Sequence, residues 1–156
     1  MMNVSLRRIL FPTDFSDPAK ESQQYACTLA ERFGAELHGL HVVHDPFHDV
    51  PASRVSWAVP DHELTQHVHS AHQHLLREMG EVWTERRKAV CSVKVGLPVD
   101  EILRYAQEHE IDLIVIGTHG RRGLTHLLLG SVAEKLVRVA TCPVLTVHPK
   151  GHQFVT

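Results

Sequence analysis

The chain has 156 residues, of which 43% are hydrophobic and 22% charged, and its formal net charge is −2. This length and composition are typical of one globular domain and exclude a disordered tail. The lack of a basic surplus argues against a dedicated nucleic-acid-binding protein, and no apolar run approaches the ~20 residues of a membrane span. The first residues, MMNVSLRR, lack the apolar stretch of a signal peptide, so we expect a cytoplasmic protein.

Strand-like and helix-like patterns alternate along the chain. Short β-branched or alternating runs predict strands, and apolar residues at i, i+3, i+4 and i+7 predict helices. Asp17-Pro18 predicts the start of the first helix and Gly34 its end. Residues 44–60 contain three prolines and predict a loop or insert within the domain. In chain order, the predicted elements are strand 6–11, helix 17–33, strand 35–43, helix 61–88, strand 89–95, a helix over 99–106, strand 111–116, a helix over 133–140 and strand 143–148.

The order of these elements, β-α-β-α-β-α-β-α-β, is typical of a parallel sheet with helices on both faces. We expect residues 1–150 to form a single domain, followed by a C-terminal tail of residues 151–156. Ligands of such sheets bind at the carboxyl ends of the strands, where the strand order reverses. The loops 12–16 and 117–131 follow the first and fourth strands, so they would face each other if those strands are neighbours.

The second of these loops, residues 117–131, has the chemistry of an anion site. Its glycines allow backbone amides to approach an anion closely, and it ends at a helix start whose N–H groups suit phosphate. Arg121 and Arg122 would add positive charge, and Ser131 would add a hydroxyl donor. The loop has neither the Walker nor the Rossmann glycine pattern. We therefore expect backbone amides and Ser131 to hold most of any bound phosphate.

A purely structural interpretation of the same residues is also open. Ser131 to Glu134 have the pattern of a capping box, in which Ser131 would serve only to start the last helix. Gly117 and Gly120 would then be ordinary turn glycines. The length of the loop favours a function, because about a dozen residues is long for a connection between a strand and a helix.

Taken together, these residues resemble the universal stress protein family. Gly117-x-x-Gly120, nine further residues and then Gly130-Ser131 resemble the family's nucleotide motif, G-2x-G-9x-G-[S/T]. Residues 9–16, ILFPTDFS, resemble its first strand and adenine-side loop. The resemblance covers nearly the whole chain, since its second, fourth and fifth strands are similar to residues 40–43, 112–117 and 142–147.

The resemblance implies a flavodoxin-like three-layer α/β sandwich, of the adenine nucleotide alpha-hydrolase-like kind, with a five-stranded parallel sheet in the order 3-2-1-4-5. It also implies an ATP-binding regulatory protein of the stress response, with Mg²⁺ beside the triphosphate. The adenine would lie near Thr13, Asp14 and the backbone of Val42, and the ribose and phosphates along the later loop. The binding residues so implied are Pro12, Thr13, Asp14, Val42, Gly117, His119, Gly120, Arg121, Gly130, Ser131 and Val132.

The family also tends to dimerise through its fifth strand. In this chain Val144–Val147 would be an apolar edge strand, and an exposed edge of that kind needs to be covered. We therefore expect a homodimer through this strand. An unknown protein partner would read the nucleotide-bound state, and neither nucleic acid nor a membrane is expected as a partner.

Three functions remain open from the sequence. ATP would order the loop after the fourth strand and bias a surface that a partner reads. A slow ATPase is the second function: Asp14 is the one obvious carboxylate of the two loops, His119 and His126 are candidates for proton transfer, and no catalytic residue is assigned. The third is a nucleotide-free stress protein with a metal-binding helix. The histidines of that helix have no spacing that specifies a metal site, and a solvent-facing polar surface explains them: His62, His67, His69, His72 and His74.

Overall fold

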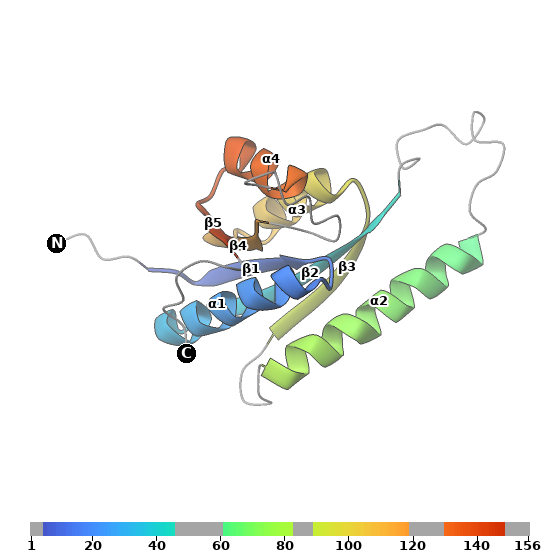
Figure 1. Cartoon of the computed structure of the whole chain (residues 1–156), viewed down its shortest axis with the longest axis horizontal. Coiled ribbons are helices and arrows are strands. Elements are labelled where there is room, and N and C mark those ends of the chain that lie inside the picture. The colour runs from blue at the N-terminus through green and yellow to red at the C-terminus, as the bar shows by residue number, and fades with distance from the viewer. Residues whose placement is uncertain (1–4, 46–60, 83–88, 119–129, 149–156) are drawn as a thin grey trace.

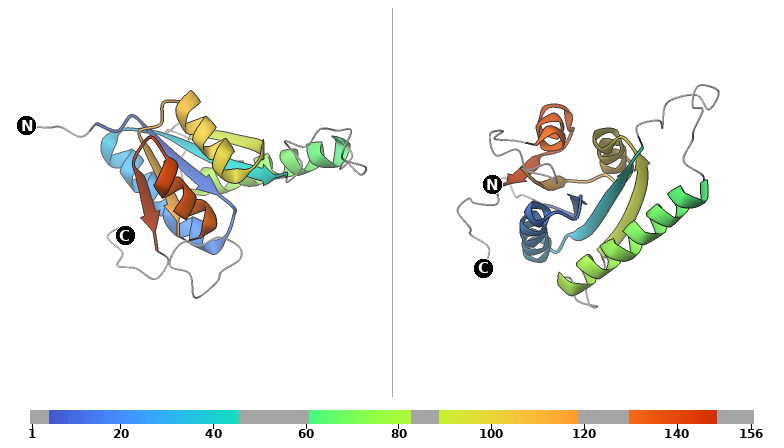
Figure 2. Two further views of the ribbon diagram at one scale, coloured as in Figure 1. Left: turned by 90° about the horizontal axis from the view of Figure 1, so that it is seen from above. Right: turned by 45° about the vertical axis from the view of Figure 1, so that its right-hand side comes forward.

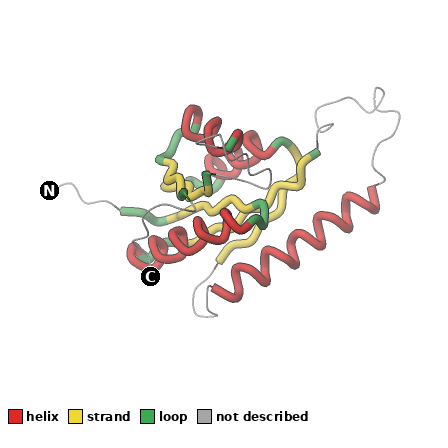
Figure 3. Tube along the Cα trace, in the orientation of Figure 1, coloured by secondary structure: helices red, strands yellow, loops and turns green. Residues whose placement is uncertain are grey.

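The computed structural model describes residues 5–45, 61–82, 89–118 and 130–148. Within these ranges strands and helices alternate along the chain (Figures 1 and 3). The strands form one parallel sheet in the order β3-β2-β1-β4-β5, which confirms the predicted α/β fold. The elements are β1 (Arg8–Thr13), α1 (Asp17–Phe33), β2 (Glu36–His44), α2 (Asp61–Val82), β3 (Ala89–Gly96), α3 (Pro98–Glu108), β4 (Leu113–Gly117), α4 (Ser131–Val139) and β5 (Val144–Val147).

The sheet is the middle layer of three. Helices α1 and α2 cover one face, and α3 and α4 cover the other (Figure 2). Successive residues of a strand point to opposite faces, so Ile9 and Phe11 join the core under α1 and α2 while Leu10 joins the core under α3 and α4. All of residues 113–116 in β4 are buried, as the β-branched run predicts for a strand covered on both faces.

The ends of α1 follow the predicted signals. Ser16 is the N-cap, and its hydroxyl accepts the backbone N–H of Ala19 at 3.4 Å. Pro18 lies in the first turn, where its missing N–H would have no partner in the helix. Gly34 ends the helix in the left-handed conformation, with φ of 64°, which glycine adopts without a steric penalty. The prediction of Gly34 as the stop is therefore confirmed.

Several predicted boundaries differ from the structure. The first strand is Arg8–Thr13 rather than 6–11, because the register with β2 begins at Arg8 and continues through Pro12 to Thr13. The fourth strand begins at Leu113 rather than 111, since the N–H of Ile111 bonds to the carbonyl of Ala106 in α3 instead. The described part of α2 ends at Val82. The rest of its predicted length, and most of the predicted insert, lie outside the described residues.

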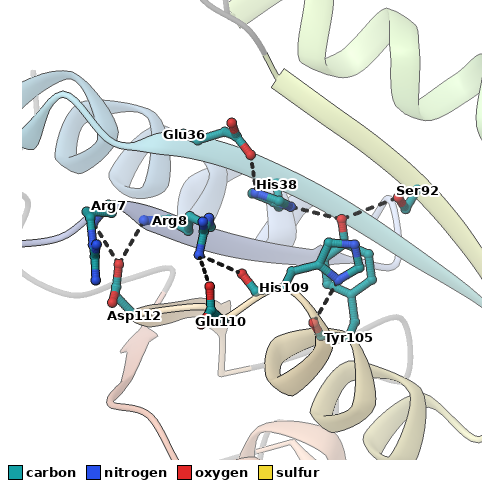
Figure 4. A network of polar contacts seen from close by, with 9 residues as sticks. All are labelled: Arg7, Arg8, Glu36, His38, Ser92, Tyr105, His109, Glu110 and Asp112. Carbon is teal, nitrogen blue, oxygen red and sulfur yellow. Dashed lines mark hydrogen bonds and ion pairs between the residues drawn. The ribbon is translucent and has the colours of Figure 1, made fainter.

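A network of polar side chains lies at the amino end of the sheet (Figure 4). Asp112 Oδ2 accepts the backbone N–H groups of Arg7 and Arg8 at 2.7 and 2.9 Å, which ties the start of β1 to the start of β4. Burial raises the pKa of Asp112, but these two N–H groups and the two arginine charges hold it below its ordinary value. Arg8 Nη1 also contacts Glu110 Oε2 at 2.9 Å.

The same network continues into the core beneath α3 (Figure 4). His38 on β2 is 2% exposed, and its Nδ1 lies 2.9 Å from the hydroxyl oxygen of Tyr105. That hydroxyl lies 3.3 Å from Ser92 Oγ on β3. His38 Nε2 also lies 2.7 Å from Glu36 Oε1. The ring of His109 stacks on Tyr105 with centroids 3.8 Å apart. A buried imidazole is thus held mainly through Tyr105 and Glu36.

Candidate functional site

The central feature of the site is the point where β1 and β4 stop pairing. Their register has only the pairs Ile9↔Leu113 and Leu10↔Ile114, whereas β1 continues to pair with β2 as far as Thr13. Pro12 lies in the stretch that has left β4, and a proline has no N–H to donate to a ladder. The strand order reverses between these two strands, which is where open α/β sheets bind ligands.

The loop after β4 is closed at its base by backbone hydrogen bonds. The N–H of Thr118 donates to the carbonyl of Val147 at 2.9 Å, and the N–H of Gly130 donates to the carbonyl of Thr118. The second bond brings Gly117 at the end of β4 close to Gly130 at the start of α4. Three residues of the predicted site fall between them and lie outside the described residues: His119, Gly120 and Arg121.

The start of α4 differs from the capping box that the sequence suggests. Gly130 is the N-cap, with φ of −68° and ψ of 153°, and its carbonyl accepts the N–H of Glu134 at 2.9 Å. Ser131 is the first helical residue and is exposed. Within the described residues, no side chain caps this helix. The interpretation of Ser131 as the N-cap is therefore wrong. The first-turn N–H groups carry the positive end of the helix dipole, and the part of the chain that the structure describes gives them no side-chain cap.

The β1–α1 turn is held by its own side chains. Thr13 Oγ1 accepts the N–H of Phe15, and Asp14 Oδ1 accepts the N–H of Ser16, each at 3.0 Å. Phe15 has φ of 64°, a left-handed conformation that costs a non-glycine residue about 1–2 kcal/mol. Thr13 and Asp14 therefore shape the turn that precedes α1 as well as lying in it.

An aromatic stack, which the sequence did not reveal, supports this turn. The ring of Phe15 stacks on His41 of β2 and on His74 of α2, with centroids 4.3 and 4.1 Å apart. Each such contact contributes about 0.5–1.5 kcal/mol, enough together to offset the backbone strain at Phe15. His41 Nδ1 lies 2.8 Å from the carbonyl oxygen of Thr13, so Nδ1 carries the donated hydrogen.

The histidines of α2 thus have different surroundings. His62, His67 and His69 are exposed, as expected for a solvent-facing surface, but His72 and His74 are partly buried, and His74 stacks against Phe15. The interpretation of this set as solvent-facing therefore holds fully only for the first three of them. Within the described residues, no group of three or more His, Cys, Asp or Glu side chains is arranged to hold a metal ion.

The backbone of Val42 lies near the carboxyl edge of the sheet. The β1–β2 ladder ends at Thr13↔His41, so Val42 lies one residue past the last pair with β1, while on its other side it pairs with Lys94 of β3. Its side chain packs into the core under α3 and α4, as does that of Val132. The described members of the predicted site lie at the carboxyl ends of β1, β2 and β4 or at the start of α4: Pro12, Thr13, Asp14, Val42, Gly117, Gly130, Ser131 and Val132.

The sequence and fold match those of a known protein family. The model of the universal stress protein family matches residues 5–148. The chain belongs to this family. A universal stress protein of Methanocaldococcus jannaschii is 37% identical over 142 residues, which cover 90% of this chain and 81% of the relative.

Solved universal stress proteins share the fold. The universal stress protein UspA from Lactobacillus plantarum is 28% identical and superposes with a TM-score of 0.77, covering 93% of this chain and 99% of that one. A universal stress protein in complex with cAMP is 23% identical, with a TM-score of 0.67 and the same coverage of both chains. At that identity the likeness shows the fold alone.

Proposed function

We propose that this universal stress protein binds ATP at the carboxyl edge of the sheet, where β1 and β4 stop pairing, and acts as a regulatory protein of the stress response. The observation that carries the proposal is the start of α4. Its first turn has no side-chain cap within the described residues, Ser131 is exposed beside it, and the Gly130–Thr118 bond holds it against the end of β4. Such a helix start favours phosphate. The fold is also that of a protein in complex with cAMP.

The two sides of this edge would share the ligand. The backbone of Val42 and the turn containing Pro12, Thr13 and Asp14 would hold the adenosine. The phosphates would accept hydrogen bonds from the N–H groups at the start of α4 and from the Ser131 hydroxyl. Gly117 and the loop residues His119, Gly120 and Arg121 would complete the phosphate side, with Val132 beneath it. Mg²⁺ would supply positive charge that offsets the triphosphate.

The test is equilibrium binding of Mg-ATP, measured by calorimetry, to the wild type and three variants. Ser131→Ala removes a hydrogen bond to a charged group and should weaken binding roughly ten-fold or more. Gly130→Val should weaken it further, because its side chain would crowd the helix start. Thr141→Ala is the matched control, since Thr141 is an exposed hydroxyl residue beyond the other end of α4.

The unfolding free energy of Ser131→Ala should stay close to that of the wild type, because Ser131 does not cap α4. Loss of ATP affinity without loss of stability supports the proposal. Absence of saturable binding by the wild type at millimolar ATP would contradict it.

We infer binding rather than dedicated hydrolysis. Hydrolysis needs a group that orients the attacking water near the terminal phosphate. Asp14 is the carboxylate available in the two loops, and it accepts the N–H of Ser16 in the turn assigned to adenosine. Incubation with Mg-ATP followed by nucleotide chromatography should therefore show no steady release of ADP. Continuous release that Gly130→Val abolishes would make the protein an ATPase.

We further propose that the protein is a cytoplasmic homodimer that presents its nucleotide-bound state to a protein partner. β5 is an edge of the sheet, and its residues include Val144, Leu145 and Val147. A second copy pairing along this strand would satisfy its outer N–H and C=O groups. Among the described residues, no helix combines the length and apolarity needed to cross a membrane.

A further inference from the structure

We propose that His74 is a positioning residue for the nucleotide site. Together with His41 it clamps the ring of Phe15, and the clamp holds the turn of residues 13–16 in the conformation that receives adenosine. The inference rests on the proposed function for its ligand. The clamp itself lies among residues that the structure describes.

The geometry places Phe15 between the two imidazoles. The centroid of its ring is 4.3 Å from that of His41 and 4.1 Å from that of His74, with interplanar angles of 22° and 16°. Both imidazole rings are nearly parallel to the Phe15 ring and close to its centre. If both lay on the same face of Phe15, they would overlap each other. His41 and His74 therefore occupy opposite faces of Phe15.

The clamp supports a turn that is otherwise under strain. Phe15 is one of two described non-glycine residues with positive φ. Such strained conformations persist where several surrounding contacts hold the residue in place, and they cluster at functional sites. The N–H groups of Phe15 and Ser16 are fixed by Thr13 and Asp14, and His41 bonds to the Thr13 carbonyl. Release of the ring would allow Phe15 to return to an extended backbone and would re-aim Thr13 and Asp14.

The clamp acts from the side of the sheet opposite to Val42. Alternation along β2 places His41 on the same face as Leu37 and Gly39, under α1 and α2, while Val42 packs on the α3 and α4 side. Phe15 packs against the α1 and α2 core as well. His74 therefore supports the turn from behind, through Phe15, and is not a ligand-contacting residue.

Two features bring His74 to this place. A Cβ added at Gly39 would lie 3.2 Å from Met79 Sδ and 3.3 Å from Leu75 Cδ1, so the glycine permits α2 to lie close against β2. His74 precedes Leu75, which is fully buried there. In addition, His74 Nε2 lies 3.7 Å from Glu78 Oε1 one turn later. The position of α2 and the shape of the β1–α1 turn are thereby coupled.

The test compares His74→Ala, which removes the outer ring, with His74→Phe, which keeps a flat ring without the imidazole nitrogens. His69→Ala is the matched control, because His69 is an exposed histidine of the same helix. The first measurement is amide hydrogen exchange at Phe15 and Ser16 in protein without nucleotide. His74→Ala should speed exchange at both amides, His74→Phe should restore protection, and His69→Ala should leave it unchanged.

The second measurement is the Kd for Mg-ATP. His74→Ala should raise it about three- to ten-fold, the range expected for loss of one aromatic stack, and His74→Phe should recover most of that loss. Equal exchange and equal affinity in His74→Ala and His69→Ala would overturn the inference. So would His74→Phe behaving like His74→Ala. If the wild type binds no adenine nucleotide while the exchange results are as expected, the proposed ligand fails and the clamp stands.

Discussion

At the scale of single residues, the buried histidine of β2 shows how the fold fixes a protonation state. His38 lies beneath α3, where burial disfavours the imidazolium form. Burial is the main cause that lowers the pKa of His38; the Glu36 carboxylate opposes it, His109 and Arg8 add to it, and the net shift is downward. The imidazole is therefore neutral in the folded protein at a pH where it is partly protonated in the unfolded chain.

This shift predicts a pH dependence of stability. Below a pH of about 6.5 the unfolded chain binds a proton at His38 more readily than the folded protein, so the free energy of unfolding falls as the pH falls from there through the lowered pKa. His38→Gln removes that proton-binding site and should cost about 1–2 kcal/mol at pH 8 through its weaker fit to the Tyr105 hydroxyl. Its stability should decline less between pH 7 and pH 5 than that of the wild type.

Urea unfolding of both proteins at several pH values checks this prediction. The observable is the difference between the two pH profiles, because the remaining ionisable groups are the same in both proteins. Parallel profiles would show that His38 does not contribute to the pH dependence.

At the scale of elements, the contact between α2 and β2 is set by a single missing side chain. Gly39 faces Leu75 and Met79, which are 0% and 2% exposed. Both side chains belong to the core under α1 and α2, so they have little room to move. The distance between helix and sheet therefore depends on glycine at this position.

Gly39→Ala should lower the free energy of unfolding by about 1–2 kcal/mol, because an added methyl group overpacks this contact. Gly80→Ala is a matched control in α2, where the new Cβ would have no atom within 4 Å. It should raise the stability by about 0.5–1 kcal/mol through helix propensity. Denaturant unfolding measures both changes, and equal stability of Gly39→Ala and wild type would mean that α2 shifts without penalty.

The elements themselves were largely predictable from sequence, while contacts between distant residues were not. Periodicity and capping residues found each strand and helix, since those signals are local, but the strand order came from the family resemblance. Ser131 matches a capping box in sequence, yet Gly130 is the cap, because its backbone is extended and its carbonyl accepts the N–H of Glu134. The stack of Phe15 with His41 and His74 joins three separate elements, and no local pattern signals it. The one sequence signal for this stack is the alternation along β2, which places His41 on the face of the sheet under α1 and α2.

At the scale of the whole molecule, the sheet has two edges, β3 and β5. β3 pairs with β2 over eight residues and is packed against α2, while β5 pairs with β4 over four. The short apolar edge is the one that we propose as the dimer interface.

Sedimentation at micromolar concentration should show a dimer for the wild type. Thr146→Lys places a charge on the edge strand, a substitution that opposes edge-to-edge pairing, and should weaken the dimer at least ten-fold. Thr141→Ala, outside the strand, should leave the mass unchanged. A wild-type monomer at this concentration would contradict the proposed interface.

The bond from Gly130 to the carbonyl of Thr118 has a consequence for protein engineering. It pins both ends of the connection between β4 and α4 at one place, so the number of residues between the ends can change without moving the helix start. Doubling the length of such a connection costs only about 0.6 kcal/mol in chain entropy. This position is thus suited to grafted recognition peptides, which would lie beside the first turn of α4.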